Sequence, residues 1–191
     1  RGFLADASPV SALRDNRDAN RPFDPGLWRE MAQMGWAGVL VPEDAGGADM
    51  GHRAAGILAE EMGEVLAASP FLSTAVIAAT ALRAAAHARL TDIAGGDVTY
   101  ALAVDEGTKH APEALRAAAS GNGFRLTGQK RFVADGASAT RLLILARTSG
   151  SPGDAQGLTL FDIDADRAGV TRTARPTIDS RDHAQLDLTD V

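Results

Sequence analysis

Residues 28–47 read WREMAQMGWAGVLVPEDAGG and combine a helix with the turn that must end it. Asp24 and Pro25 predict where this helix begins, because a carboxylate can accept a bond from a free amide and proline has its φ already set for a helix. Apolar residues follow at helical spacing: Leu27, Met31 and Met34. Gly35 can end the helix in a left-handed cap, and the proline and paired glycines of residues 41–47 exclude a helix there.

Ala-rich helical patterning continues after this turn as far as Asp97. Further helices are expected at Gly51–Leu66, Ser69–Ala86 and Arg89–Ala94. The apolar face of the first of them is expected to carry Ile57, Leu58, Met62 and Val65. These patterns predict an all-helical domain over residues 1–97.

The composition changes near Asp97, and short β-favouring runs follow. Strands are expected at Thr99–Val104, Phe124–Leu126, Arg131–Ala134, Leu142–Ala146, Leu158–Ile163 and Gln185–Leu188. A hairpin signal at Ser120–Gly123 and a flexible loop at Ser149–Asp154 separate some of these runs. This spacing predicts a small antiparallel β-barrel or sandwich over residues 98–191. The chain as a whole is therefore expected to be α+β.

The composition excludes several classes of protein. The chain has 191 residues, a net charge of −6 and no cysteine. An acidic chain is a poor ligand for nucleic acids or acidic membranes, and without cysteine it has neither disulfides nor thiolate metal sites. The longest apolar stretches, such as Pro70–Leu82, are too short and too rich in Ala and Thr to span a bilayer. No signal peptide is visible, and a cytoplasmic enzyme is expected.

No self-contained active site is visible in the residues. The four histidines, His52, His87, His110 and His183, are scattered and lack metal-ligand spacing, and neither Gly-x-Gly-x-x-Gly nor a P-loop occurs. Glu60 and Glu61 are adjacent on a helix and point in different directions, which favours a solvated face over a catalytic pair. Lys130-Arg131 could contact a phosphate, but alternating strand residues place one of the two in solvent.

Three stretches together resemble the acyl-CoA dehydrogenase superfamily. The first is residues 28–47, which match that family's helix and its following turn with Pro-Glu and paired glycines. The second is the helix containing Glu60–Gly63. The third reads GFRLTGQKRFV over residues 123–133, is followed by LILAR at 143–147, and resembles a strand pair of the family's middle domain. The resemblance covers nearly the whole chain in the family's order and spacing.

The resemblance implies a helical N-terminal domain, a β middle domain and a C-terminal four-helix bundle, assembled around FAD. The bundle is absent from residues 1–191. The implied reaction is α,β-dehydrogenation of an acyl-CoA thioester, in which a carboxylate removes the α-proton and the β-hydrogen leaves as hydride to flavin N5. In most members that carboxylate belongs to the C-terminal domain, so no catalytic residue and no metal ligand is expected here.

The family's cofactor contacts fall on two strands of this sequence. They are Ala101, Ala103 and Val104 on the first, and Phe132, Val133 and Ala134 on the second. Phe132 keeps the aromatic ring that stacks near the flavin. Val104 and Ala134 stand where the family usually has threonine hydroxyls that contact it. Each missing hydrogen bond would cost about 0.5–1.5 kcal/mol, although backbone amides at the same positions could still serve the ring.

Several readings of the assembly remain open. The chain could bind FAD through backbone and partner contacts, or it could be a non-catalytic partner in a heteromeric enzyme whose other subunit holds the complete site. The family implies an acyl-CoA substrate and a homo- or heterotetramer, and it includes heterotetramers that act on steroid side-chain CoA thioesters. An acyl-CoA oxidase or a flavin monooxygenase would share the fold but not the chemistry.

Overall fold

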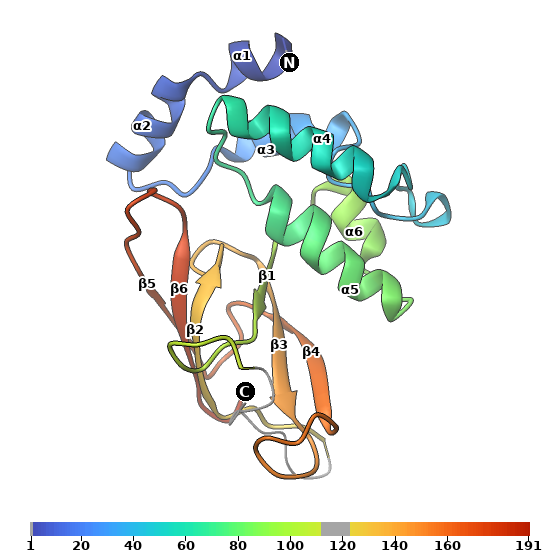
Figure 1. The fold of residues 1–191 in the computed structure, drawn as a ribbon, viewed down its shortest axis with the longest axis vertical. Helices are drawn as coiled ribbons and strands as arrows, with labels where there is room; N and C mark the ends of the chain where they lie inside the picture. Colours follow the sequence, from blue (N-terminus) through green and yellow to red (C-terminus); the bar gives the residue numbers. More distant parts are fainter. Residues whose placement is uncertain (1, 112–122) are drawn as a thin grey trace. The chain divides into compact units, whose positions relative to one another are not determined.

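The computed structural model describes residues 2–111 and 123–191. It separates into two compact units, Arg1–Thr99 and Tyr100–Val191, which we call the helical unit and the β unit. Helices occur only in the first and strands only in the second among the described residues, which confirms the α+β class (Figure 1). The predicted hairpin signal lies outside the described residues, apart from Gly123.

The helical unit contains six α-helices, one 3₁₀ turn and one π-helix among the described residues. They are α1 (Gly2–Ala7), α2 (Val10–Asp18), α3 (Pro25–Gln33), η1 (Glu43–Ala45), α4 (Gly51–Glu64), the π-helix η2 (Phe71–Ala78), α5 (Ala79–Ala84) and α6 (Leu90–Gly95). Within the described residues, every helix is too short or too polar to cross a lipid bilayer.

Helix α3 begins and ends where its local chemistry requires. The Gly26 amide donates to Asp24 Oδ1 at 2.8 Å, and Pro25 occupies the first helical position. Gly35 follows the helix with φ +81°, the left-handed region that the predicted cap needs. Trp28 and Met31 face inward and are buried. The predicted helix and both its boundaries are confirmed.

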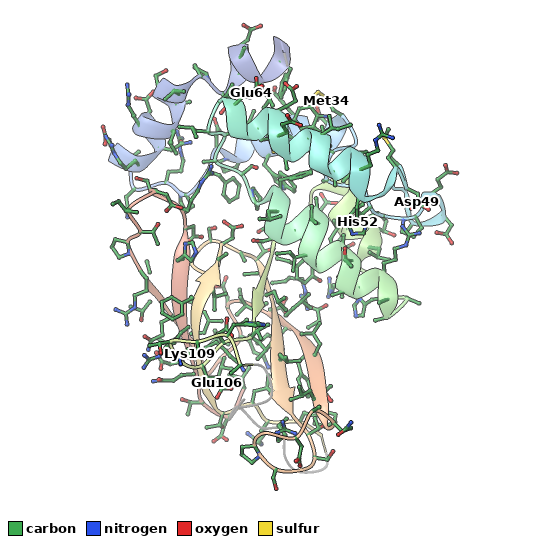
Figure 2. All side chains as sticks on the ribbon, in the orientation of Figure 1. Met34, Asp49, His52, Glu64, Glu106 and Lys109 are labelled. Atoms are coloured by element: carbon green, nitrogen blue, oxygen red, sulfur yellow. The ribbon has the colours of Figure 1, made fainter. Side chains whose placement is uncertain are left out.

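The turn after α3 is folded tightly back on itself. Gly46 adopts φ +82°, and Gly47 is packed so closely that a Cβ there would lie 2.0 Å from the carbonyl oxygen of Val41. Arg83 of α5 fixes the same turn from outside, because its guanidinium donates to the Leu40 carbonyl at 3.1 Å and pairs with Asp49. Asp49, which is labelled in Figure 2, lies just before the N-terminal end of α4. The paired glycines are therefore a steric requirement of the turn.

Two details of the helical unit differ from expectation. Ile57 was expected on the apolar face of α4, but its side chain is 54% exposed, while Met62 is buried as expected. The predicted helix at Ser69–Ala86 exists as the π-helix η2 followed by α5. Both differences have one reason: helical periodicity predicts that residues share a face, whereas neighbouring elements decide which face is covered and how tightly the helix is wound.

Among the described residues, the β unit contains two three-stranded sheets. Their strands are β1 (Tyr100–Ala103), β2 (Gly128–Ala134), β3 (Arg141–Arg147), β4 (Leu158–Asp164), β5 (Val170–Ala174) and β6 (His183–Leu188). One sheet has the order β1-β3-β4 and the other β2-β6-β5. Buried residues from both sheets, among them Ala101, Leu142 and Leu186, share one hydrophobic core. The unit is therefore a sandwich rather than a closed barrel.

Three details of the β unit differ from the predictions. Strand β1 pairs with β3 in parallel, while the other strand pairs are antiparallel as expected. Phe124–Leu126 forms no strand, although Leu126 and Val191 exchange two backbone hydrogen bonds of 2.9 and 3.1 Å. Strand β5 (Val170–Ala174) was not predicted, because it carries three consecutive polar residues, Thr171 to Thr173, and is mostly exposed.

Candidate functional site

The six predicted cofactor-binding residues fall into a buried and an accessible group. The side chains of Ala101, Ala103 and Val133 lie in the hydrophobic core of the β unit. Only their backbone groups are left for a ligand. Val104 is half-buried, whereas Phe132 and Ala134 are exposed at the end of β2. The accessible part of the predicted site is therefore the C-terminal end of β2 together with the segment that follows β1.

A β-bulge at Arg131 and Phe132 shapes the end of β2. Lys130 pairs with Leu186 of β6, but Val133 already pairs with Ala184, so the two residues between them oppose Gln185 alone. Phe132 adopts φ +54°, a left-handed conformation that is rare for a bulky side chain. The residue is 64% exposed. The bulge therefore holds an aromatic ring outside the sandwich at a strained backbone position.

We expect Phe132→Gly to be more stable than Phe132→Ala by about 1 kcal/mol, because only glycine adopts a positive φ without a steric cost. The measurement is urea unfolding of both variants. Ala134→Gly is the control: Ala134 is not among the residues with positive φ, and there glycine should weaken the strand. Equal stabilities of the two Phe132 variants would contradict the strain.

The backbone of Ala134 points to the open side of β2. The Asp135 amide donates to the Asp182 carbonyl at 2.8 Å, which makes Asp135–Asp182 a hydrogen-bonded pair. Bonded and non-bonded pairs alternate in antiparallel strands, so Ala134 and its partner His183 form a non-bonded pair. The N–H and C=O of Ala134 are therefore directed away from β6. Because β2 is an outer strand of its sheet among the described residues, they are available to a ligand there.

A buried ion pair ties the segment after β1 to β2. Lys130 is fully buried, and its Nζ donates to Glu106 Oε1 at 2.8 Å and to the Val104 carbonyl at 3.2 Å. Burial lowers the pKa of Lys130, and the Glu106 carboxylate opposes that shift. The Arg131 amide also donates to the Asp105 carbonyl at 2.7 Å. These contacts bring the two predicted halves of the site, at Val104 and at the bulge, side by side.

The surroundings of this ion pair are polar. His110 Nδ1 lies 2.8 Å from Asp105 Oδ1, and Figure 2 labels Glu106 and Lys109 on the same segment after β1. Arg131 is exposed while Lys130 is buried, which confirms that one residue of this pair faces solvent. Within the described parts of the chain, no group of three or more His, Asp or Glu side chains is placed to bind a metal ion.

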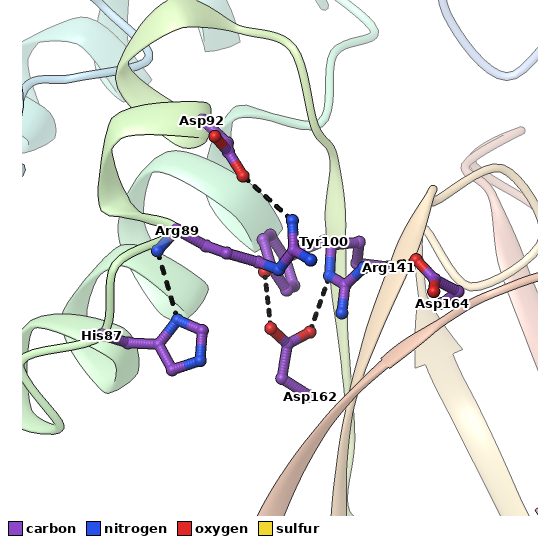
Figure 3. Close-up of polar contacts among 7 residues, drawn as sticks. All are labelled: His87, Arg89, Asp92, Tyr100, Arg141, Asp162 and Asp164. Atoms are coloured by element: carbon purple, nitrogen blue, oxygen red, sulfur yellow. Dashed lines mark hydrogen bonds and ion pairs between the residues drawn. The ribbon is translucent and has the colours of Figure 1, made fainter.

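A second polar cluster lies in the sheet β1-β3-β4. The hydroxyl of the buried Tyr100 donates to Asp162 Oδ2 at 3.1 Å, and Arg141 Nε donates to Asp162 Oδ1 at 2.8 Å (Figure 3). Arg141 also pairs with Asp164. Burial raises the pKa of Tyr100, and the negative charge of Asp162 adds to the shift. The cluster links three neighbouring strands, and we assign it to stability rather than to ligand binding.

The alkaline titration of Tyr100 should report this environment. Tyr100 is the only tyrosine in the sequence, so tyrosinate absorbance belongs to it alone. A raised folded-state pKa means that the folded protein keeps a proton that the unfolded chain releases, so stability is lost as pH rises above the unfolded value of about 10. We expect tyrosinate absorbance to appear only on alkaline unfolding, and Tyr100→Phe to unfold less steeply with pH. Ionisation near the ordinary value in the folded protein would contradict the burial.

The structure adds His183, which sequence reasoning treated as scattered. His183 opposes Ala134 across β2 and β6, and its ring Nδ1 is buried without a hydrogen-bond partner among the residues that the structure describes. Strand register alone brings it there, and no local sequence signal could have indicated it. Phe132 presents an exposed aromatic ring and Ala134 an edge amide, and the buried Nδ1 of His183 belongs to the residue opposite Ala134. This set suits a planar heteroaromatic ligand, and a flavin ring is of that kind.

Comparisons with known proteins agree with the fold. Residues 1–91 match the acyl-CoA dehydrogenase N-terminal domain family. The acyl-CoA dehydrogenase FadE27 of Mycobacterium tuberculosis is 31% identical over 171 residues, which are 87% of this chain and 44% of the relative.

Solved structures show the same similarity in three dimensions. The Tcur3481-Tcur3483 steroid ACAD G363A variant superposes with a TM-score of 0.84 at 30% identity, over 100% of this chain and 52% of that one. The ChsE4-ChsE5 complex from Mycobacterium tuberculosis gives 0.83 at 27% identity, over 98% and 51%. The chain thus spans about half the length of these relatives. With the helical unit, the two-sheet β unit and these similarities in agreement, the chain belongs to the acyl-CoA dehydrogenase superfamily.

Proposed function

We propose that the chain is part of an acyl-CoA dehydrogenase-type flavoprotein subunit, with residues 1–97 as its helical N-terminal domain and 98–191 as its β middle domain. The observation that carries the proposal is the bulge of β2, in which Phe132 is 64% exposed and has φ +54°. Strained backbone of this kind clusters at functional sites. An exposed aromatic ring beside an edge amide is what a bound isoalloxazine would contact.

Each accessible residue has a role in this proposal. Phe132 covers one region of the flavin ring and excludes water from it, and the Ala134 amide donates to a ring acceptor. The ion pair of Lys130 and Glu106 keeps Val104 next to them. FAD, when bound, accepts the hydride from the β-carbon of the acyl-CoA. The base that removes the α-proton is proposed to lie in the part of the relatives that this chain does not span.

The relatives favour a particular assembly and substrate. The two structural relatives are each named for two components, and one of them is named a steroid ACAD. We therefore favour a hetero-oligomer, as a heterotetramer, over a homotetramer, with a bulky CoA thioester as substrate. We place the enzyme in the cytoplasm.

The test is flavin retention and reduction by the full-length protein. Purified with any partner it retains, it should show flavin absorbance that bleaches anaerobically with steroid side-chain or fatty acyl-CoA thioesters. Rapid oxygen consumption after reduction would instead indicate an oxidase or a monooxygenase. A fully assembled, colourless protein that responds to no thioester would defeat the enzymatic proposal.

A second candidate is a non-catalytic partner subunit. It is favoured by the absence of side-chain hydroxyls at Val104 and Ala134, where the family's flavin contacts usually have them. Expression with and without the protein encoded beside it would separate the two. If this chain retains flavin alone, the partner-only role is wrong. If flavin appears only when the neighbour is present and stays with it on separation, the partner role is correct.

A further inference from the structure

His183 is placed to supply the polar side chain that the predicted site lacks. The resemblance implies a threonine hydroxyl where this chain has Ala134. The structure puts His183 directly opposite Ala134 on the neighbouring strand. The two form a non-hydrogen-bonded pair, the kind in which the side chains of opposite residues approach most closely, with Cβ atoms about 4.5–5.5 Å apart.

Strand alternation puts both side chains on the same face of the sheet. Val133 and Ala184 point into the core and are buried. Their neighbours Ala134 and His183 must therefore point to the opposite face, which also carries the exposed end of the bulge. Because Ala134 ends at its methyl group, it leaves the space beside the imidazole free of a competing polar side chain.

The burial of Nδ1 of His183 carries an uncompensated free-energy cost. Nδ1 of His183 is buried with no hydrogen-bond partner among the residues that the structure describes. A buried polar atom without a partner carries the full cost of its lost hydration, and such atoms in a native fold call for an explanation. A ligand that supplies the missing partner would remove that cost on binding.

We propose that His183 is a flavin-positioning residue, which hydrogen-bonds the ring through Nδ1 and replaces the hydroxyl absent at Ala134. This inference rests on the proposed function, because it needs the flavin to lie against β2. It extends that function by naming the residue from β6 that completes the site.

The experiment measures FAD affinity in the full-length protein, purified with any partner it retains and stripped of flavin. FAD is titrated by quenching of its fluorescence. His183→Ala should weaken binding by about tenfold, the ratio that corresponds to one hydrogen bond. His183→Asn keeps a polar atom where Nδ1 stands and should retain most of the affinity, whereas His183→Gln places it where Nε2 stands and should not.

Two further variants separate a ligand contact from a structural role. Asp187→Asn alters a residue on the same face of β6 that pairs with Gln129, away from the bulge, and should leave FAD affinity unchanged. Ala134→Thr in the His183→Ala background should recover the lost affinity, since it restores a hydroxyl across the strand pair. Thermal melts without FAD should be alike for His183→Ala and His183→Asn, while their FAD affinities differ.

The outcomes distinguish this inference from the function on which it rests. If the unmodified protein takes up FAD and His183→Ala binds it equally well, the positioning role is wrong and the proposed function stands. If affinity falls equally in the Asn and Ala variants and Ala134→Thr recovers nothing, the role of His183 is structural. If the unmodified protein takes up no FAD, both are overturned.

Discussion

Replacing Glu106 by leucine should lower the free energy of unfolding by about 3–5 kcal/mol, because the ammonium of Lys130 would stay buried without its carboxylate. Lys130 is fully buried, its Nζ lies 2.8 Å from Glu106 Oε1, and the Glu106 side chain is only 14% exposed. A charge so placed cannot recover its hydration without opening the fold. Urea unfolding at neutral pH measures the loss.

A double variant tests whether the loss of stability comes from the unpaired charge. Glu106→Leu combined with Lys130→Met removes both charges and keeps apolar volume, so its stability should return to near that of the unmodified protein. The exposed pair Arg17–Asp18 offers a matched control, and Asp18→Asn should cause no measurable change. A double variant as unstable as Glu106→Leu would mean that the loss comes from packing rather than from the unpaired charge.

Gly47→Ala should destabilise the helical unit by about 3 kcal/mol, at the upper end of the cost of overpacking. A Cβ at this position would lie 2.0 Å from the Val41 carbonyl oxygen and 2.5 Å from its carbonyl carbon. Those atoms belong to the backbone of a turn that is hydrogen-bonded across its width, so they cannot move aside as a flexible side chain would. Thermal or urea unfolding followed by circular dichroism measures the effect.

Gly46 provides the control for this prediction. It has φ +82°, but a Cβ there would meet nothing within 4 Å. Gly46→Ala should therefore cost only the left-handed strain, about 1–2 kcal/mol. If Gly46→Ala proved the more damaging of the two, the close approach of Gly47 to Val41 would not be the feature that makes the turn depend on glycine.

Local chemistry explains which parts of the fold the sequence predicts well. The start of α3 depends on Asp24 and Pro25 and its end on Gly35, each within one turn of the boundary that it sets, so these boundaries can be predicted from neighbouring residues in the sequence. Strand β5 shows the opposite case. It is mostly exposed, and it forms a strand because it pairs with β6. No local sequence pattern predicts that pairing.

The candidate site depends on register, which explains why it was only half predicted. Phe132 and Ala134 were indicated by resemblance, but the bulge that exposes Phe132 arises from how β2 and β6 align. The same alignment puts His183 opposite Ala134. Lys130 reads in the sequence as one of two adjacent cations, and only the segment carrying Glu106 explains how it can be buried. The bulge at Phe132, the position of His183 and the burial of Lys130 all depend on contacts between residues far apart in the sequence.

The bulge also has a consequence for association between molecules. An outer strand with a regular row of free amides is a template on which another chain can add a strand, the first step towards aggregation. In β2 that row is interrupted, because Phe132 turns the backbone into the left-handed region and the Arg131 amide is already bonded to Asp105. The irregularity that exposes an aromatic ring thus also protects the sheet against growing at this edge.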